Sequence, residues 1–404
     1  MVLSQLAPLP PHGPAERLLR WCAGPGLTLP LPELIEAFAR AAQAEGLALR
    51  RLNVTLQVLH PLFIARVLRW LDGTPGVAVV DMSRRLVQND AYLSSPVRRL
   101  FDGELRAVRH RMHPGEPQPY PVLDEYVAKG MTDYVAVVAS PPGGRMTVVT
   151  AMTDAPDGFS QADLQLLDAA FAGLTPLLAL AIQRFIAQNV CATYIGPITG
   201  PRVLDGAIVR GSVESLQAVI WFCDLRGFTP TTARLGSRAV VDLLNRFFDA
   251  VGPAVTDAGG EILKFIGDAA LAIFPLRDGD APGPTCARAL SAARAALAAL
   301  AEANAAALAA GELPLRAGFA LHVGEVSYGN IGTADRLDFT VIGAAVNLTA
   351  RLEGLCGALC EPLVASGDFA RAAEAGLRPL GRHPLKGVDG EVEAFGLPAE
   401  ARAP

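Results

Sequence analysis

Two aspartates in the second half of the chain each follow an apolar segment, where a carboxylate could bind a divalent cation. Asp224 ends the short apolar run of residues 218–223, which is typical of a central strand covered on both faces. Asp268 follows Gly267 between two apolar runs, and this pattern predicts a β-hairpin with a tight turn. A hairpin beside the first strand would bring the two carboxylates together, and such oxygen ligands favour Mg²⁺ or Mn²⁺ over zinc.

Two further segments suit a phosphate-bearing ligand. From Gly227 onward the backbone can approach an anion closely, and residues 237–255 predict an amphipathic return helix. Residues 336–353 predict a strand followed by a helix, on which Asn347 and Arg351 lie four apart and share one face. An amide and a guanidinium placed in this way would clamp an oxygen-rich transition state.

These segments together resemble the class III nucleotidyl cyclases, which convert ATP or GTP into the cyclic 3′,5′-monophosphate. The resemblance covers roughly residues 216–397. Taken alone, each residue has a plainer explanation, such as a helix N-cap for Asp224, but the joint order and spacing of the motifs are specific. The motifs are Phe222-x-Asp224-x-x-Gly227-Phe228-Thr229, Lys264-x-x-Gly267-Asp268 and Gly343-x-x-Val346-Asn347-x-x-x-Arg351-Leu352.

The resemblance implies a set of metal and catalytic residues. Asp224 and Asp268 match the metal-binding aspartates, and the backbone carbonyl of Leu225 matches the main-chain ligand, with two Mg²⁺ or Mn²⁺ ions in each site. Asn347 and Arg351 match the pair that orients the ribose and stabilises the α-phosphoryl transition state. The implied reaction is in-line attack of the ribose 3′-hydroxyl on the α-phosphorus with loss of pyrophosphate, which two metals can assist without a separate general base.

The resemblance also implies how the nucleotide is recognised. Lys264 matches the lysine that reads adenine, Lys386 matches a lysine that holds the terminal phosphates, and Phe228 and Thr229 belong to the substrate-binding motif. Thr340 stands where many members carry aspartate, as in a threonine-bearing subgroup. A threonine hydroxyl can donate or accept a hydrogen bond, so base discrimination depends more on Lys264. ATP is the favoured substrate, with GTP, and hence a guanylate cyclase, as the alternative.

Class III cyclases place the metal carboxylates on one subunit and the base-reading, Asn and Arg residues on the other. Because this chain carries both sets in one domain, a homodimer with two composite sites is expected. The expected fold is α+β, with a ferredoxin-like (palm-type) catalytic domain at residues 214–398.

Composition excludes some functions. With 404 residues, two domains are expected. The formal net charge of −5 does not suggest a nucleic-acid-binding surface. Charged or strongly polar residues interrupt every long apolar stretch, and the N-terminus lacks the pattern of a signal peptide. We therefore expect a cytoplasmic protein without a membrane span.

The first half of the chain predicts a second, regulatory module. Residues 1–15 are rich in proline and are expected to be loose. Residues 16–189 predict short strands closed by a helix that begins near Ser160, which is similar to GAF-type α/β sensor domains. Its small-molecule effector is not identified by the sequence. Residues 190–213 are rich in glycine and proline and predict a turn-rich linker.

The closing helix carries an apolar stripe with two open explanations. The stripe could form a coiled-coil seam with a partner chain, or it could pack on the sheet of its own domain. Its members are Leu164, Leu167, Phe171, Leu174, Leu178, Ile182 and Phe185.

Histidines and cysteines give no metal site. His110 and His113 lie among arginines beside a proline, which favours a solvated loop. Cys356 and Cys360 could share a helix face, and a pair of reduced core thiols is the favoured explanation.

Two further function classes stay open. Gly259-Gly260-Glu261 superficially resembles the signature of diguanylate cyclases, but the carboxylate required directly afterwards is absent. A non-catalytic nucleotide-binding regulator is the other class, against which the intact metal aspartates argue.

Overall fold

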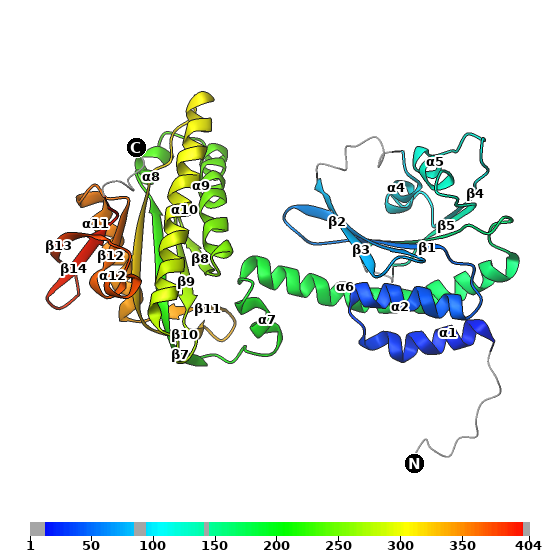
Figure 1. Ribbon diagram of the computed structural model, residues 1–404, viewed down its shortest axis with the longest axis horizontal. Helices are drawn as coiled ribbons and strands as arrows, with labels where there is room; N and C mark the ends of the chain where they lie inside the picture. The colour runs from blue at the N-terminus through cyan, green and yellow to red at the C-terminus, as the bar shows by residue number, and fades with distance from the viewer. Residues whose placement is uncertain (1–12, 85–93, 141–144, 399–404) are drawn as a thin grey trace, which may run out of the picture. The chain divides into compact units, whose positions relative to one another are not determined.

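The computed structural model describes residues 13–84, 94–140 and 145–398, and the chain divides into two compact units, Met1–Val190 and Cys191–Pro404. Each unit contains its own β-sheet with helices packed on it, so the fold is α+β (Figure 1). Most of the predicted loose N-terminus lies outside the described residues. The prediction is wrong at its end, because Pro14 already begins a helix, where proline is well tolerated.

The first unit is built on a six-stranded antiparallel sheet with the order β3-β2-β1-β6-β5-β4. Its strands are β1 (Arg51–Gln57), β2 (Phe63–Leu71), β3 (Val77–Ser83), β4 (Ala107–Arg111), β5 (Asp133–Val138) and β6 (Thr147–Thr153). Its helices are α1 (Pro14–Ala23), the 3₁₀ helix η2 (Pro25–Thr28), α2 (Leu31–Ala44), α4 (Pro96–Phe101), α5 (Pro121–Val127) and α6 (Gln161–Tyr194).

The two faces of this sheet are covered differently. Helices α1, α2 and α6 lie on one face, where Leu52, Val54 and Leu56 of β1 enter the main core of the unit (Figure 1). Helices α4 and α5 lie on the other face, above a smaller apolar cluster that includes Leu100 and Leu123. The alternation of side chains along β1 therefore sends its polar residues toward α4 and α5.

The apolar stripe of helix α6 packs within the first unit. Leu167, Phe171, Leu174, Leu178 and Ile182 are buried in the core of the first unit, so the stripe packs on its own sheet. By length and composition α6 could also cross a membrane, and it is the one such helix in the described part of the chain; half of the qualifying window is buried inside the unit. The absence of a membrane span and the cytoplasmic location therefore stay predictions.

The predicted loop at His110 is wrong. Residues 107–111 form the edge strand β4, and the His110 ring packs edge-on against Tyr120, with 5.3 Å between ring centroids. The neighbouring charge is accommodated because Arg109 forms an ion pair of 2.6 Å with the buried Asp133. His113 follows the strand in an exposed turn.

Four strands and two long helices of the second unit follow one another along the chain as strand–helix–strand–strand–helix–strand. In the sheet these strands have the order β10-β7-β9-β8, and all neighbours are antiparallel. This is the predicted ferredoxin-like arrangement. The strands of the unit are β7 (Val213–Leu225), β8 (Glu261–Ile266), β9 (Ala269–Pro275), β10 (Ala317–Gly332), β11 (Leu337–Ile342), β12 (Leu363–Ser366), β13 (Arg378–Pro384) and β14 (Glu391–Gly396). The helices are α7 (Thr199–Leu204), α8 (Phe228–Thr232), α9 (Ser237–Asp257), α10 (Pro282–Ala309), α11 (Ala344–Ala358) and α12 (Gly367–Ala373).

The central strand β7 has an apolar core on each face. Trp221 and Cys223 pack with residues of α9 and α10, whereas Ala218 and Ile220 pack with residues of β11 on the opposite face. The prediction of a strand covered on both faces is confirmed, and the strand is longer than the apolar run. Asp224 lies on the β11 face, two residues beyond Phe222.

The predicted linker at residues 190–213 is instead an ordered part of the second unit. Helix α6 continues to Tyr194, α7 follows, and Ile195, Val203 and Ala207 pack on the apolar cluster beneath β11. Glycine and proline marked the turns correctly, but the apolar residues between them bury surface against the sheet of the second unit, which favours a docked conformation.

Candidate active site

The two aspartates meet at one end of the central strand. Asp224 lies opposite Ala269 of β9 in the antiparallel register, and Asp268 directly precedes Ala269 in the turn. Gly267 in that turn has φ of +65°, a conformation that residues with a side chain rarely adopt. The hairpin thus brings the carboxylate of Asp268 into contact with that of Asp224, as the sequence predicted.

Burial and like charge both act on this pair. Desolvation, followed by the negative charge of Asp268, raises the pKa of Asp224, while Arg226 and the backbone N–H of Leu225 oppose the rise. Both the burial of Asp224 and the negative charge of Asp268 therefore disfavour the ionised form of Asp224. In the described part of the chain, no cluster of three or more His, Cys, Asp or Glu side chains forms a metal site, so the candidate donor set is the two aspartates with the backbone carbonyl of Leu225.

A second charged pair lies behind the aspartates and was not predicted. Arg226 forms an ion pair of 2.6 Å with Glu353 of α11, whose side chain is 8% exposed. Burial raises the pKa of Glu353 to about 7, although Arg226 opposes the rise. Gly318 of β10 leaves room for this pair, since a Cβ there would lie 2.1 Å from Arg226 Nη2. The sequence feature that could have indicated this pair is Glu353, a carboxylate among the residues that α11 buries.

The residues predicted to read the base lie near β11. A β-bulge between Ile262 and Lys264 allows Lys264 to lie on the β11 side of the sheet, where its ammonium forms an ion pair with Asp338. Sequence reasoning missed Asp338 as a partner. Thr340, two residues further along β11, is 5% exposed, and its hydroxyl has no hydrogen-bond partner within the residues that the structure describes.

Helix α11 presents the predicted amide and guanidinium to solvent. Asn347 and Arg351 are exposed one turn apart, and no side-chain hydrogen bond or ion pair joins either to another described residue. Glu353 lies on the buried side of the same helix, about 200° around the axis from Arg351. Lys386 is exposed in the turn after β13.

The remaining predicted residues frame the aspartates. Leu225 is 5% exposed at the end of β7. Gly227, with φ of +70°, leads into the short helix α8, in which Phe228 is half-buried against the α9 and α10 core and Thr229 is exposed.

The two predicted core thiols differ in burial. Cys356 is buried and donates a hydrogen bond from Sγ to the carbonyl of Phe319, whereas Cys360 is exposed. The prediction of two core thiols is therefore wrong for Cys360, because the helix ends before it and its φ is +53°.

Part of the second unit matches a known protein family. Residues 212–359 match the model of the adenylate and guanylate cyclase catalytic domain. The match contains the aspartates, Lys264, Thr340, Asn347 and Arg351, and it ends before Lys386.

Individual relatives also match less than half of the chain. An adenylate cyclase of Anabaena cylindrica is 35% identical over 179 residues, which are 43% of this chain and 33% of the relative. A terminal-differentiation-specific adenylate cyclase of Dictyostelium discoideum is 36% identical over 150 residues, 37% of this chain and 7% of the relative. The chain thus spans a third or less of the length of these two relatives.

A solved structure adds a similar match. The adenylyl cyclase CyaB of P. aeruginosa is 25% identical with a TM-score of 0.42, over 46% of this chain and 95% of that one. On the family match, and with both aspartates at the end of its central strand, the second unit of this chain contains an adenylate and guanylate cyclase catalytic domain.

Proposed function

We propose that the second unit converts ATP into 3′,5′-cyclic AMP and pyrophosphate. The observation that carries this proposal is the contact between Asp224 and Asp268 inside the segment that matches the cyclase model. Relatives named as adenylate cyclases support ATP as the nucleotide.

The donor set fits a hard divalent cation. Two carboxylates and the backbone carbonyl of Leu225 offer oxygen only, which suits Mg²⁺ or Mn²⁺. Positive charge between the carboxylates would offset the desolvation and the negative charge of Asp268, which together raise the pKa of Asp224. When bound, two such ions would supply acidification of the ribose 3′-hydroxyl and neutralisation of charge on the departing pyrophosphate.

The side chains of α11 act on the ribose and the α-phosphate. Arg351 has no carboxylate partner among the described residues, so its five donors are free to meet charge that develops on the α-phosphoryl oxygens. Loss of such a donor typically costs about 3 kcal/mol of barrier. Asn347, one turn earlier, orients the ribose, and Lys386 holds the terminal phosphates.

Base selection rests on Lys264 and Thr340. The unpartnered, buried hydroxyl of Thr340 is available to a base, and Asp338 holds the Lys264 ammonium beside it. Lys264 would donate to an adenine ring nitrogen. Because the hydroxyl can also donate to a guanine carbonyl, GTP is the second candidate substrate.

The two faces of α11 support a homodimer with composite sites. Glu353 faces the aspartates of its own chain through Arg226, so Asn347 and Arg351, on the exposed side of the helix, point away from them. One chain therefore does not bring Arg351 to its own Asp224. A two-fold related copy would supply the missing face to each site.

The first unit is proposed to act as a GAF-like sensor that regulates this output. The segment that follows α6 is docked on the catalytic sheet through Glu261, which gives a change in the first unit a direct path to the cyclase core. Removal of residues 1–190 should therefore alter cyclase output, and unchanged specific activity with unchanged effector responses would contradict regulation by this path.

Turnover is tested on the purified chain with Mn²⁺ or Mg²⁺ and either ATP or GTP, with the products separated by chromatography. Cyclic AMP is expected, and it should disappear in Asp268→Ala. Cyclic GMP alone would identify a guanylate cyclase, a dimeric guanine product a diguanylate cyclase, and no turnover a non-catalytic regulator. Near-normal activity of Asp268→Ala would contradict its role as a ligand.

Composite sites are tested by mixing two inactive variants. Asp268→Ala and Arg351→Ala remove residues from opposite sides of the proposed interface. In an equal mixture, half of the dimers carry one intact site of two, so about a quarter of the wild-type activity should return. If no activity returns while exchange of subunits is shown, each site is built within one chain.

A further inference from the structure

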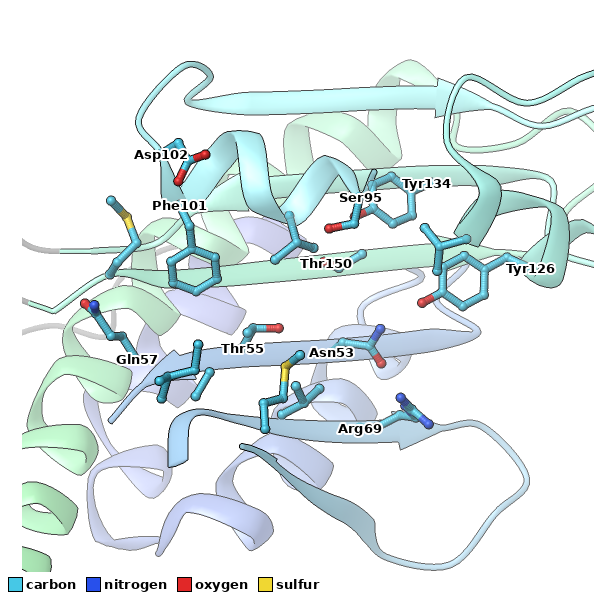
Figure 2. A pocket seen from close by; sticks show the side chains of 17 residues that line it. Asn53, Thr55, Gln57, Arg69, Ser95, Phe101, Asp102, Tyr126, Tyr134 and Thr150 are labelled. Carbon is cyan, nitrogen blue, oxygen red and sulfur yellow. The ribbon is translucent and has the colours of Figure 1, made fainter. Parts of the chain in front are cut away.

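The first unit contains a cavity of about 520 Å³ between its sheet and helices α4 and α5. Its floor is formed by side chains of β1, β2 and β6, and Phe101 and Asp102 close it from the end of α4 (Figure 2). Cavities of this volume hold small organic molecules. A bridging water occupies about 30 Å³, so one or two waters would not fill it.

The floor of this cavity is polar although it is buried. Asn53 and Thr55 are 7% and 6% exposed, and both face the cavity from β1, the strand whose other face enters the apolar core. The Asn53 carbonyl oxygen accepts a hydrogen bond of 3.1 Å from Arg51 Nε. The amide nitrogen of Asn53 and the hydroxyl of Thr55 have no partner within the described residues. Both groups line the cavity, so they are available to hydrogen-bond a molecule that enters it.

An exposed cation, Arg69, lies at one end of the cavity. Arg69 of β2 lies directly opposite Asn53 in the strand register, and its side chain lies at the same end of the cavity as Asn53 and Tyr126 (Figure 2). No hydrogen bond or ion pair joins Arg69 to any residue that the structure describes. By contrast, Arg66 on the opposite face of the same strand is fully engaged, with an ion pair of 2.6 Å to Asp81. An exposed guanidinium at the end of the cavity, beside the Asn53 amide, suits a carboxylate or a phosphate.

The other walls favour a planar ring. Tyr126 and Tyr134 lie nearly parallel, with an interplanar angle of 17°, and Phe101 lines the opposite end (Figure 2). The Arg51 guanidinium lies 4.9 Å from the centroid of the Tyr126 ring and holds this wall in place. An aromatic body would contact these rings, while its anionic group would reach Arg69.

We propose that this cavity is the effector site of the first unit and that it binds a small aromatic anion, with its acidic group on Arg69 and its polar substituents on Asn53 and Thr55. The assignment of the site deepens the proposed function, because the effect on cyclase output rests on that function. Binding itself does not rest on it.

Binding is tested on the full chain without nucleotide. Thermal-shift screening uses one- and two-ring aromatic carboxylates and phosphate monoesters, each beside its neutral amide or alcohol, and calorimetry follows the hits. Anions should stabilise the protein and their neutral counterparts should not, and the two anion classes separate a carboxylate from a phosphate effector. Arg69→Gln should weaken binding about tenfold or more, whereas Arg66→Gln, on the same strand but facing away, should leave it unchanged.

A second variant separates a binding role from a structural one. Thr55→Val keeps the shape of the side chain and removes a hydroxyl that has no partner among the described residues. It should leave the melting temperature of the ligand-free chain unchanged or raise it, and weaken binding several-fold. The proposal is overturned if no anion in the panel stabilises the wild-type chain, or if the hits bind Arg69→Gln and Thr55→Val as tightly as wild type. Binding without any cyclase turnover would contradict the proposed function and leave this site standing.

Discussion

Replacement of Glu261 by glutamine tests whether one buried carboxylate docks the segment after α6 on the catalytic sheet. Glu261 is 1% exposed at the start of β8. It accepts hydrogen bonds from the backbone N–H groups of Ile198 and Thr199 at 2.9 and 2.8 Å. It also accepts from the hydroxyls of Thr199 and Tyr328 at 3.0 and 3.1 Å. Four donors around one carboxylate leave no acceptor capacity unused.

The magnitude follows from these four bonds. A hydrogen bond to a charged group contributes about 1.5–3 kcal/mol, and a neutral one about 1 kcal/mol. Glutamine retains one oxygen for the two backbone donors, but each bond loses its charge assistance. The new amide group presents N–H donors to the two hydroxyls, one of which can then donate to the other. We therefore expect Glu261→Gln to destabilise the docked segment by about 3 kcal/mol, or about a hundredfold in its opening equilibrium.

Hydrogen exchange followed by mass spectrometry measures this opening directly. Peptides that cover residues 198–206 should exchange about a hundredfold faster in Glu261→Gln, while peptides of α9 should not change. Glu214→Gln is the matched control, because Glu214 pairs at 2.7 Å with Arg202 of α7 at an exposed site. Exposed pairs contribute less than about 1 kcal/mol. Equal exchange in the two variants would refute the docking role of Glu261.

Three further predictions concern the catalytic end of the second unit. Asp268→Asn should abolish turnover yet raise the melting temperature in a metal chelator, because it removes the charge that burdens Asp224; a lower melting temperature would contradict this account. Burial raises the pKa of Glu353 from its ordinary 4.5 to about 7, so the folded chain binds more protons in that window and stability should fall as pH rises from 4.5 to 7. Thermal denaturation at several pH values should show a smaller fall in Glu353→Gln, and an equal fall would exclude this residue. Lys264→Glu combined with Thr340→Cys should shift the ATP-to-GTP ratio of kcat/KM toward GTP, and an unaltered ratio would undo the assignment of these residues to base reading.

Local patterns predicted the strands that carry the catalytic residues, because each of these strands is indicated by a short run of neighbouring residues. The apolar run before Asp224 and the Gly267 turn each define a strand end, and the antiparallel register then fixes which side chains meet. The resemblance to a family added roles that no local pattern could give. What local patterns could not supply were contacts between residues far apart in the chain, such as Arg226 with Glu353.

The errors have the same physical origin. Residues 190–213 have the composition of a linker, and their order comes from Glu261, more than sixty positions from Thr199. The strand at His110 was missed because its charges suggested solvent, whereas Arg109 is neutralised by a buried aspartate on the next strand. The side of the sheet on which Lys264 lies depends on a bulge, which composition does not reveal.

If the first unit regulates the cyclase as proposed, the docking of α7 offers a route by which it could act. The Arg202 guanidinium of α7 lies 5.4 Å from the Tyr328 ring centroid and 5.7 Å from that of Phe339. These two rings pack edge-on at 4.8 Å, and Phe339 is flanked on β11 by Asp338 and Thr340. A displacement of α7 therefore reaches the base-reading strand through two ring contacts, whereas the aspartates lie at the far end of β7. Because packed side chains transmit strain over short distances, the nucleotide-binding side of the site should respond to the first unit before the metal side does.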